Sequence, residues 1–539
     1  MIRNKARPSS WYMLFLGATT LSLQVASAAL ARAEDVTLVY AVPAVAQNVD
    51  PAIWEGDASR WTKWEQGSTL GAYDYQSFPD HGCKVLASIA DIKLDLASSW
   101  ELSADHTYYL VKLKSAKSPS GNTLSSTDVV WSFERQKALS GVARDMFFSQ
   151  AKYKKDGTIE IVDEQTFKLY VDTPTAMDMP IQTLGPFAFT IYDSVEVKKH
   201  ASTDDPWAKG WLSNHTANYG PWTAERVDPG NEVVYGRNPN YVGNRGNVDR
   251  VVIRAIPDAS TRFQLLQAGE VDVAARLSFD EYATLATVPD VTVDSCVSPV
   301  RDTLVLQQAD KRFADVKVRQ AISYAIDRDA LVSTVYHGFA RPSKNSLPAA
   351  YNAPGSSTVF RYDPALAKQL LAEAGYPDGF TASMLIHTSR PGPHVEELAV
   401  TLQSQLQQVG LNWKIDVATS AADFATRYAE RKFDAILYLD PPAIADPLYT
   451  LVNYNASKAK QNTFGYANAD YDTLVTKLAT ILKPGAERDT ILVDIDKVVM
   501  ATMPMIYLVD RQYIQAYRSN VRGIVNAPHG ELLFTILSK

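Results

Sequence analysis

Cysteine and clustered histidine are scarce in this sequence, and their scarcity limits the chemistry it can support. Only Cys83 and Cys296 occur among its 539 residues. In an oxidising compartment the two could pair, or they could be separate buried thiols, and the sequence leaves both readings open. The 8 histidines are scattered, and neither a CxxC nor an HExxH motif is present. A zinc site built by the protein is therefore not expected, and neither is any other cofactor.

Long apolar runs are missing after residue 33, where no stretch of about 18 apolar residues could span a bilayer. The segment before that point has the order of a secretory signal peptide. Basic residues within 1–7 precede the mostly apolar stretch 11–30, and Ala31–Ala33 fits a cleavage site, with Ala26–Ala28 as a second candidate. No cysteine follows to carry a lipid. We therefore predict a signal peptide at 1–33 and export of a protein without a membrane anchor.

Clusters of positive charge are absent as well. The chain has 53 Lys and Arg against 60 Asp and Glu, and the segment 1–33, which is basic and holds no acid, makes the remainder more acidic still. Nucleic acid is therefore not an expected partner, because binding it needs clustered Lys and Arg. An apolar content of 46% with 21% charged residues indicates a folded protein. Its length suggests three or four domains of ~150 residues each.

The common catalytic motifs are also missing. We find no GxSxG elbow, no GxxxxGK[ST] phosphate loop and no GxGxxG sequence after a strand. The glycines of residues 243–246 belong to no such pattern and suit a surface turn. Carboxylates are plentiful, but their number alone cannot identify the facing pair that a glycosidase needs. We therefore do not expect an enzyme, and a secreted hydrolase is kept only as a distant alternative.

Periodic patterns predict both strands and helices. Alternation with a period of two predicts strands at 109–113 and 167–171. In the second half, Asp363 and Pro364 begin a helix that Gly375 is placed to end.

Helix and strand then alternate along the chain. We predict a helix at 395–409, a strand at 411–417, a helix at 422–431 and a buried strand at 433–438. This alternation predicts an α/β protein with a parallel or mixed sheet covered by helices, in which ligands bind beyond the strand ends.

Eight blocks of sequence stand out along the chain. They are Asn48–Ala52, Leu96–Glu101, Asp128–Phe133, Gly220–Trp222, Arg237–Tyr241, Gly269–Asp272, Asp315–Arg328 and Tyr362–Phe380. Together they resemble the extracytoplasmic solute-binding proteins of peptide-type ABC importers, the dipeptide- and oligopeptide-binding family 5. Their order is that of the family, and they cover nearly all of the chain after residue 33, although the segment Tyr73–Asp95, which contains Cys83, matches poorly.

The strongest block, Asp315–Arg328, has a structural explanation. Its apolar residues lie on one face of a helix. Asp315 and Asp327 are placed to cap two successive helices. Arg319 is expected to take part in an internal ion pair. Such residues specify the fold and say little about the ligand.

The resemblance implies a two-lobed α/β fold of the type II periplasmic-binding-protein class, with mixed sheets covered by helices and an extra domain on the first lobe. On this basis lobe I comprises 34–80, 200–299 and 508–539. The extra domain comprises 81–199, and lobe II comprises 300–507. The ligand lies between the lobes in this family, and lobe closure buries it, so that its charged ends need partners.

The resemblance also suggests which residues meet those charges. Peptide-binding members use an aspartate for the α-amino group, and Asp440 stands where that aspartate is found. Arg390, before Pro391, resembles the arginine that binds the carboxylate in dipeptide binders; a guanidinium fork suits a carboxylate. Each has an ordinary alternative: Asp440 precedes Pro441 and could cap a turn, and surface loops often carry an arginine before a proline.

Aromatic residues are candidates to form the walls of the cleft. Tyr438 and Trp54 are included among the predicted ligand-binding residues, and Trp61 and Trp64 are further candidates. Any of them could instead belong to the core.

The implied function is that of the periplasmic substrate-binding component of an ABC importer that delivers short peptides to a membrane permease. Its partners would be inner-membrane permease subunits with a cytoplasmic ATPase, and a monomer is expected. The missing lipidation cysteine points to a Gram-negative periplasm. Alternative solutes are an opine, a glycoside-type compound or a metal chelate, and a chemoreceptor-coupled or chaperone-like role stays open. Residues 442–444 change the spacing between Asp440 and Asp446 relative to dipeptide binders, so ligand length is open too.

Overall fold

The structure of the protein is a computed structural model, and its elements belong to one unit, Val36–Lys539. The predicted signal peptide, Trp64 and Cys83 lie outside the described residues. The described residues are 35–63, 67–73, 84–85, 92–139, 146–181, 190–243, 245–351, 361–444, 446–526 and 532–539.

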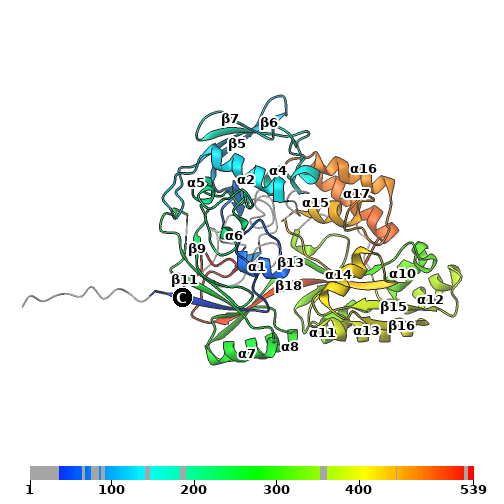
Figure 1. The fold of residues 1–539 in the computed structure, drawn as a ribbon. Helices are drawn as coiled ribbons and strands as arrows, with labels where there is room; N and C mark the ends of the chain where they lie inside the picture. Colours follow the sequence, from blue (N-terminus) through cyan, green and yellow to red (C-terminus); the bar gives the residue numbers. More distant parts are fainter. Residues whose placement is uncertain are drawn as a thin grey trace, which may run out of the picture. The chain divides into compact units, whose positions relative to one another are not determined.

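In this part of the chain the largest sheet has 11 strands, and two long antiparallel strands stand at its centre. In spatial order its strands are β16 (Leu411–Val417), β15 (Phe380–Ile386), β17 (Ala435–Asp440), β13 (Val291–Leu306), β18 (Ile506–Arg518), β12 (Val273–Ala274), β1 (Thr37–Val42), β11 (Arg250–Ala255), β10 (Glu232–Arg237) and β9 (Trp222–Asp228), with β14 (Ala340–Pro342) paired to β18. Because β13 and β18 lie in the middle, they join strands from the two halves of the sequence (Figure 1).

The sheet is mixed, as the sequence predicts. β1 runs parallel to β11 and β12, and β15 runs parallel to β16 and β17, whereas β13 is antiparallel to both β17 and β18. The predicted strand at 411–417 is confirmed as β16, and the buried strand predicted at 433–438 is found two residues later, as β17. β17 is buried along its whole length.

Helices pack against the strands of the second half and enclose one apolar core with them. Their bounds are α9 (Lys311–Ala314), α10 (Val316–Tyr324), α11 (Arg328–Thr334), α12 (Pro364–Glu373) and α13 (Val395–Gln407). The buried residues of α14 (Ala421–Ala429) belong instead to the core that includes Tyr438. The helices predicted from 363, 395 and 422 are confirmed as α12, α13 and α14. In the first half, α7 (Ala259–Ala268) and α8 (Phe279–Leu285) lie together at one edge (Figure 1).

Three aspartates cap helices as predicted. The side chain of Asp315 accepts from the backbone N–H of Lys317, and Asp327 and Asp363 accept in the same way at the starts of α11 and α12. Each cap satisfies one of the N–H groups that a helix leaves free at its start. Gly375 follows the end of α12 with φ +87°, a left-handed conformation that favours glycine.

The expectation for Arg319 is wrong. Its guanidinium donates to the backbone carbonyls of Met503, Phe313, Ala314 and Thr502 instead of to a carboxylate. These carbonyls lie at the ends of helices that are close in space. The arginine side chain has several N–H donors, so it can hydrogen-bond to all of them at once. Arg319 joins α9, α10 and the chain after α17 (Ala486–Thr502).

A separate four-stranded sheet lies at the far end of the unit from α7 and α8 (Figure 1). In spatial order it contains β5 (Ala97–Leu102), β6 (Tyr108–Leu113), β8 (Thr166–Tyr170) and β7 (Ile159–Ile161), which confirms the two strands predicted near 109 and 167. The remaining helices and turns are α1 (Asp57–Lys63), α2 (Ser126–Leu139), η2 (Met146–Gln150), α4 (Asp178–Ile181), α5 (Ser194–Lys198), α6 (Lys209–Leu212), η4 (Ala349–Tyr351), α15 (Pro447–Thr450), η5 (Leu451–Asn455) and α16 (Ala469–Ala479). Two short ladders pair β2 (Gly71–Tyr73) with β4 (Ile92–Leu94) and β3 (Lys84–Val85) with β19 (Val525–Asn526).

One apolar core extends from this smaller sheet to the second half of the chain. It contains Val111 and Phe133 on one side and Leu451 and Ile495 on the other. Hydrogen bonds cross between the same regions, since Gln150 Nε2 donates to Asn453 Oδ1 at 2.9 Å and the N–H of Ala176 donates to the carbonyl of Ala479 at 2.8 Å. The segments predicted as extra domain and lobe II are therefore in direct contact.

Cys296, on β13, is disulfide-bonded. The sequence has one other cysteine, Cys83, which lies outside the described residues. The sequence allows either a disulfide or separate buried thiols, and a free thiol at Cys296 is thus excluded.

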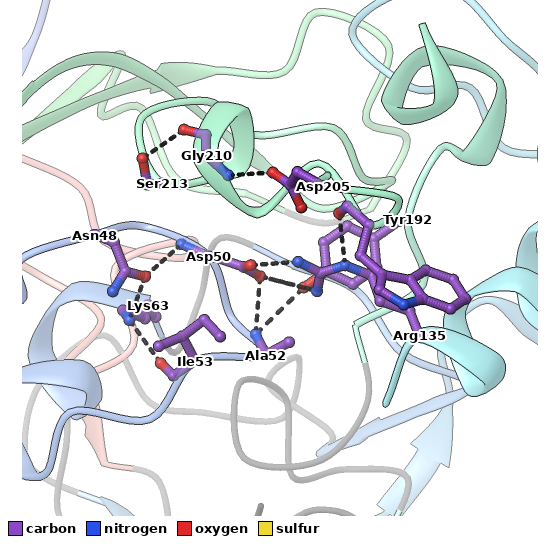
Figure 2. Close-up of polar contacts among 11 residues, drawn as sticks. Asn48, Asp50, Ala52, Ile53, Lys63, Arg135, Tyr192, Asp205, Gly210 and Ser213 are labelled. Atoms are coloured by element: carbon purple, nitrogen blue, oxygen red, sulfur yellow. Dashed lines mark hydrogen bonds and ion pairs between the residues drawn. The ribbon is translucent and has the colours of Figure 1, made fainter. Parts of the chain in front are cut away.

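A buried ion pair ties the chain after β1 to α2 (Figure 2). Arg135 donates to Asp50, and Tyr192 donates to the same carboxylate at 2.7 Å. The N–H of Ala52 also donates to it, at 3.1 Å, which fixes the turn that begins at Asp50. Buried charges are tolerated when they are paired and hydrogen-bonded in this way.

Nearby, the ammonium of Lys63 is satisfied inside the protein. It donates to Asn48 Oδ1 at 2.9 Å and to the carbonyl of Ile53 at 2.7 Å (Figure 2). Glu55 lies at 3.3 Å from the same ammonium. Burial nevertheless lowers the pKa of Lys63, with Glu55 and Asp50 acting against this effect.

We predict that Asp50→Asn lowers the free energy of unfolding by about 3–5 kcal/mol, because it leaves the Arg135 guanidinium buried without a counter-charge. Glu160→Gln is the control, since the pair of Glu160 with Lys168 lies in solvent and should contribute little to stability. Chemical unfolding followed by circular dichroism measures both. Equal losses in the two variants would contradict a special role for Asp50.

Candidate functional site

A buried carboxylate with an unused oxygen stands at the end of β17. In the strand register, Arg301 of β13 lies between Asp440 of β17 and Asp510 of β18. The guanidinium of Arg301 pairs with Asp510, because its Nε donates to Asp510 Oδ1 at 2.7 Å. Its Nη1 donates to the carbonyl of Asn345 at 2.9 Å. Asp440 is 7% exposed, and its Oδ1 has no hydrogen-bond partner among the described residues. A buried oxygen in this state favours binding of an external donor.

The same environment changes the titration of Asp440. Burial raises its pKa to about 7, although the positive charge of Arg301, the Thr450 hydroxyl and the positive charge of Arg390 act in the opposite direction. A carboxylate that lacks a close counter-charge loses stability when it leaves water. Asp440 therefore holds a proton more readily than a solvated carboxylate, and a bound cation would favour its ionised form.

Tyrosines from four different elements surround this carboxylate. Burial raises the pKa of each, and the negative charge of Asp440 raises it further, which places all of them close to Asp440. They are Tyr351 of η4, Tyr449 of α15, Tyr454 of η5 and Tyr507 of β18. Their rings supply flat apolar surface, and their hydroxyls supply polar contacts.

Arg390 and Tyr438 lie in the same site. Tyr438 and Asp440 are two residues apart on β17 and so point to the same face of the strand. Arg390 Nη1 donates to the Tyr438 hydroxyl at 2.7 Å, and its guanidinium carbon lies 5.0 Å from the centre of the Tyr438 ring. Tyr438 also stacks on Tyr428 with ring centres 4.5 Å apart. The structure thus brings three of the four predicted residues together.

The fourth residue, Trp54, approaches from the segment between β1 and α1. It is partly buried and packs against the apolar core that includes Tyr438 and Tyr454. The guanidinium carbon of Arg60 lies 5.8 Å from the centre of the Trp54 ring. The charge of Arg60 lowers the pKa of Tyr449, which the charges of Asp440 and Arg390 also shift. Trp54 is therefore placed at the edge of this group.

A second buried polar group, which the sequence did not reveal, occupies the other face of the central strands. Asp302 follows Arg301 on β13 and therefore points the opposite way. It accepts from His394 Nε2 at 2.8 Å and from the Tyr336 hydroxyl at 2.7 Å, and Arg511 Nη1 lies 3.6 Å from its other oxygen. Arg511 also donates to the carbonyl of Pro391, at 3.0 Å.

These neighbours set the charges of the group. Burial alone would raise the pKa of Asp302, but Arg511, His394 and Tyr336 together hold it below its usual value. Burial lowers the pKa of His394, with Asp302 acting against this. The positive charge of the group is therefore that of Arg511, and the Asp302 carboxylate opposes it.

A pocket opens beside this second group, between segments predicted as lobe I and lobe II. Leu439 and Pro441, the neighbours of Asp440, line it, whereas Asp440 itself, Arg390, Tyr438 and Trp54 do not. Residues from β1, α1, α8 and β18 complete the wall, and those with aromatic or charged side chains include Tyr40, Trp61, Arg276, Phe279, His394 and Arg511. Trp61, a candidate wall residue from the sequence, thus does line a pocket.

The described residues contain neither a metal-binding cluster nor a membrane-spanning helix. No three His, Cys, Asp or Glu side chains there are grouped so that they could hold a metal ion. None of the helices in the same ranges is long and apolar enough for a membrane crossing.

Comparison with known proteins gives a consistent result. A family model described as "Bacterial extracellular solute-binding proteins, family 5 Middle" matches residues 91–462. A probable D,D-dipeptide-binding periplasmic protein of Escherichia coli (strain K12) is 27% identical over 506 residues, which is 93% of each chain. The heme-binding protein A of Haemophilus influenzae (strain ATCC 51907 / DSM 11121 / KW20 / Rd) is 28% identical over 468 residues, covering 82% of this chain and 83% of the relative.

A solved structure shows the same fold. It is an ABC transporter-associated periplasmic binding protein from Helicobacter pylori in complex with the peptide STSA, with a TM-score of 0.77 and 24% identity, covering 93% of this chain and 98% of the other. The two-lobed α/β fold expected from the sequence is therefore confirmed.

The titration of Asp440 yields a prediction for the protein without solute. Because folding raises its pKa from 3.8 to about 7, the folded state keeps a proton that the unfolded chain releases between these values. The contribution of this group to stability is full below about pH 4 and is lost as the pH rises to about 7. Asp440→Asn should remove this loss, so its stability relative to wild type should rise by on the order of 4 kcal/mol between those limits. Thermal unfolding across this pH range measures the difference, and parallel curves for the two proteins would contradict it.

Proposed function

Since the family model spans well over half of it, the chain belongs to the bacterial extracellular solute-binding proteins of family 5, and we propose that its solute is a short peptide. The observation that carries this proposal is the buried Asp440 oxygen without a hydrogen-bond partner among the described residues. In this role the α-ammonium of the peptide binds Asp440. A buried carboxylate and an ammonium compensate each other, whereas either alone is strongly unfavourable.

Arg390 supports the other half of the proposal. It lies within electrostatic reach of Asp440, from a different segment of the chain. A guanidinium holds a carboxylate through two parallel hydrogen bonds. The hydrogen bond from Arg390 Nη1 to the Tyr438 hydroxyl holds the guanidinium in place. In this position Arg390 binds the α-carboxylate of the peptide. The aromatic rings of Tyr438, Tyr449 and Trp54 pack against the peptide between its two ends.

The charges of the site favour a peptide over other solutes bound by similar proteins. One relative is a heme-binding protein, and one solved structure of similar fold holds agropinic acid. Heme carries carboxylates but no ammonium, so it would leave Asp440 without compensation. An opine carries both charges and is the alternative that the test below separates from a peptide.

In the cell this function is solute capture for import. The protein is exported to the periplasm by its signal peptide, binds the peptide between its lobes as a monomer, and delivers it to permease subunits that are driven by a cytoplasmic ATPase. Lobe closure excludes water from the bound charges and strengthens their interactions. No covalent step takes place. Lobe I comprises 34–80, 200–299 and 508–539, with the extra domain at 81–199 and lobe II at 300–507.

We predict that Asp440→Asn weakens binding of the dipeptide Ala-Ala by about thirtyfold or more, because the ammonium loses a buried charged partner. Wild-type affinity should also fall about tenfold per pH unit below about pH 7, since a proton must leave Asp440 before the ammonium binds, and the variant should lose this slope. Isothermal titration at several pH values measures both effects.

Asp178→Asn is the matched control. Asp178 is buried with a pKa that burial also raises to about 7, but it accepts from Tyr109 and Thr175 in the smaller sheet region and lies outside the site. Its substitution should leave the affinity for Ala-Ala unchanged. A solute at a hundredfold excess over its Kd raises the free energy of unfolding by ~2.7 kcal/mol. If an opine raises the unfolding temperature of wild type while Ala-Ala and longer peptides do not, the peptide proposal is wrong.

We predict that Arg390→Gln weakens binding of Ala-Ala by at least about tenfold, whereas binding of its C-terminal amide is almost unaffected. The reason is that the amide removes the carboxylate that the guanidinium holds. Arg390→Lys should lie between the two, because it keeps the charge and loses the fork. Equal losses for acid and amide would place Arg390 outside carboxylate recognition.

A further inference from the structure

The polar group of Asp302 and Arg511 lies on the opposite face of the central strands from Asp440. It nevertheless contacts the Arg390 loop, residues 387–394, which joins β15 to α13. We propose that Arg511, anchored by Asp302, is a positioning residue that holds the Arg390 loop in place for solute binding. This inference deepens the proposed function and rests on it, because that function assigns the carboxylate of the peptide to Arg390.

One donor of Arg511 serves the backbone of the loop. Its Nη1 donates to the carbonyl of Pro391 at 3.0 Å and lies farther, at 3.6 Å, from Asp302 Oδ1. That carboxylate oxygen is buried and has no hydrogen-bond partner among the described residues. A charge-assisted hydrogen bond between the two side chains would be the stronger contact. The guanidinium therefore hydrogen-bonds to the loop instead of completing its ion pair with Asp302.

Several contacts fix the guanidinium of Arg511 in this position. Asp302, on β13, carries the opposite charge, and its carboxylate accepts from His394 Nε2 at 2.8 Å and from the Tyr336 hydroxyl at 2.7 Å. On α8, the centre of the Phe279 ring lies 5.5 Å from the guanidinium carbon. A long side chain that is already ordered by its neighbours loses little further conformational entropy when it holds another segment.

The backbone of the loop lies directly against this group. A Cβ added to Gly392 would lie 3.2 Å from two atoms of the His394 ring and 4.0 Å from Arg511 Nη1. Gly392 also has a φ of +155°, a backbone conformation that residues with a side chain rarely adopt. Glycine at this position thus lets the loop approach the guanidinium that holds it.

The contact at Pro391 reaches Arg390 through one peptide bond. The N–H of Arg390 donates to the carbonyl of His387 at 3.0 Å, so the backbone of Arg390 is held on both sides. Its Nη1 donates to the Tyr438 hydroxyl at 2.7 Å. A loop that is ordered before the solute arrives does not lose this entropy on binding, and the affinity is correspondingly higher.

Isothermal titration with Ala-Ala and with its C-terminal amide tests this role. Arg511→Met keeps an unbranched side chain of similar length and removes its donors. It should weaken binding of Ala-Ala about fivefold, because the solute must then order the loop. Binding of the amide should stay within about twofold of wild type, since the amide lacks the carboxylate that Arg390 holds. Arg511→Lys should restore part of the loss, because its ammonium still donates to the Pro391 carbonyl.

A double variant separates positioning of Arg390 from other roles of Arg511. The variant that combines Arg390→Gln with Arg511→Met should bind Ala-Ala as tightly as Arg390→Gln alone, because Arg511 acts through Arg390. A further loss of about fivefold in the double variant would overturn the inference, since independent effects add. A loss for the amide equal to that for the acid would also overturn it.

Arg319→Met is the matched control. Arg319 also donates to backbone carbonyls, among them that of Met503, but none of them belongs to the Arg390 loop. This variant should keep the wild-type ratio of acid to amide affinity. Should Arg511→Met not fold, Asp302→Asn takes its place: it removes the charge that anchors Arg511 and should lower the same ratio by about threefold. An unchanged ratio in Asp302→Asn would then overturn the inference.

Amide hydrogen exchange measures the hold on the loop without any solute. Exchange in the segment 387–394, followed by mass spectrometry, should be about fivefold faster in Arg511→Met than in wild type and unchanged in Arg319→Met. If Ala-Ala does not bind wild type but exchange in Arg511→Met is faster, the proposed function fails and the hold on the loop stands. Equal exchange in wild type and Arg511→Met would overturn the inference, whatever the result with Ala-Ala.

Discussion

A single guanidinium between two carboxylates governs the chemistry of this protein. Arg301 lies in register with both Asp440 and Asp510, but its donors serve Asp510 and the carbonyl of Asn345. Asp440 is thereby buried without full compensation, and this raises its pKa to about 7. Without solute, the free energy of the site is consequently higher than it would be if Arg301 donated to Asp440. Under the proposed function, an ammonium from a solute removes this imbalance, so the electrostatic deficit and the affinity have the same origin.

The central strands place two different polar groups back to back. Arg301 and Asp302 are neighbours on β13 and point to opposite faces, as do Asp510 and Arg511 on β18. One face therefore presents Asp440, and the other presents Asp302 and Arg511 beside the interlobe pocket. Because the central strands separate them, the two groups form distinct polar environments.

The sequence predicts local features well and long-range ones less well. The caps at Asp315, Asp327 and Asp363 depend on residues two or three positions away, and each is found as predicted. Asp440 is named through the family resemblance, which places the amino-binding aspartate just after the strand predicted at 433–438, and in the structure it is the last residue of β17. Arg319 was assigned the wrong partners because the carbonyls it binds include those of residues 502 and 503, which only the folded chain brings near. The group of Asp302, His394 and Arg511 depends on the β13–β18 register, which no local pattern specifies.

The contacts that define the fold and those that could define the solute involve different residues. The Asp50–Arg135 pair and the helix caps hold segments together without lining the interlobe pocket, and the same fold holds the peptide STSA in one solved structure and agropinic acid in another. Such a division lets a fold persist while its ligand changes. In this chain the candidate residues for solute contact lie at the end of β17 and around Arg390, and none of them belongs to the Asp50–Arg135 pair or to the three aspartate caps. Under the proposed function, the choice of solute therefore depends on a few charges, first among them the incompletely compensated Asp440.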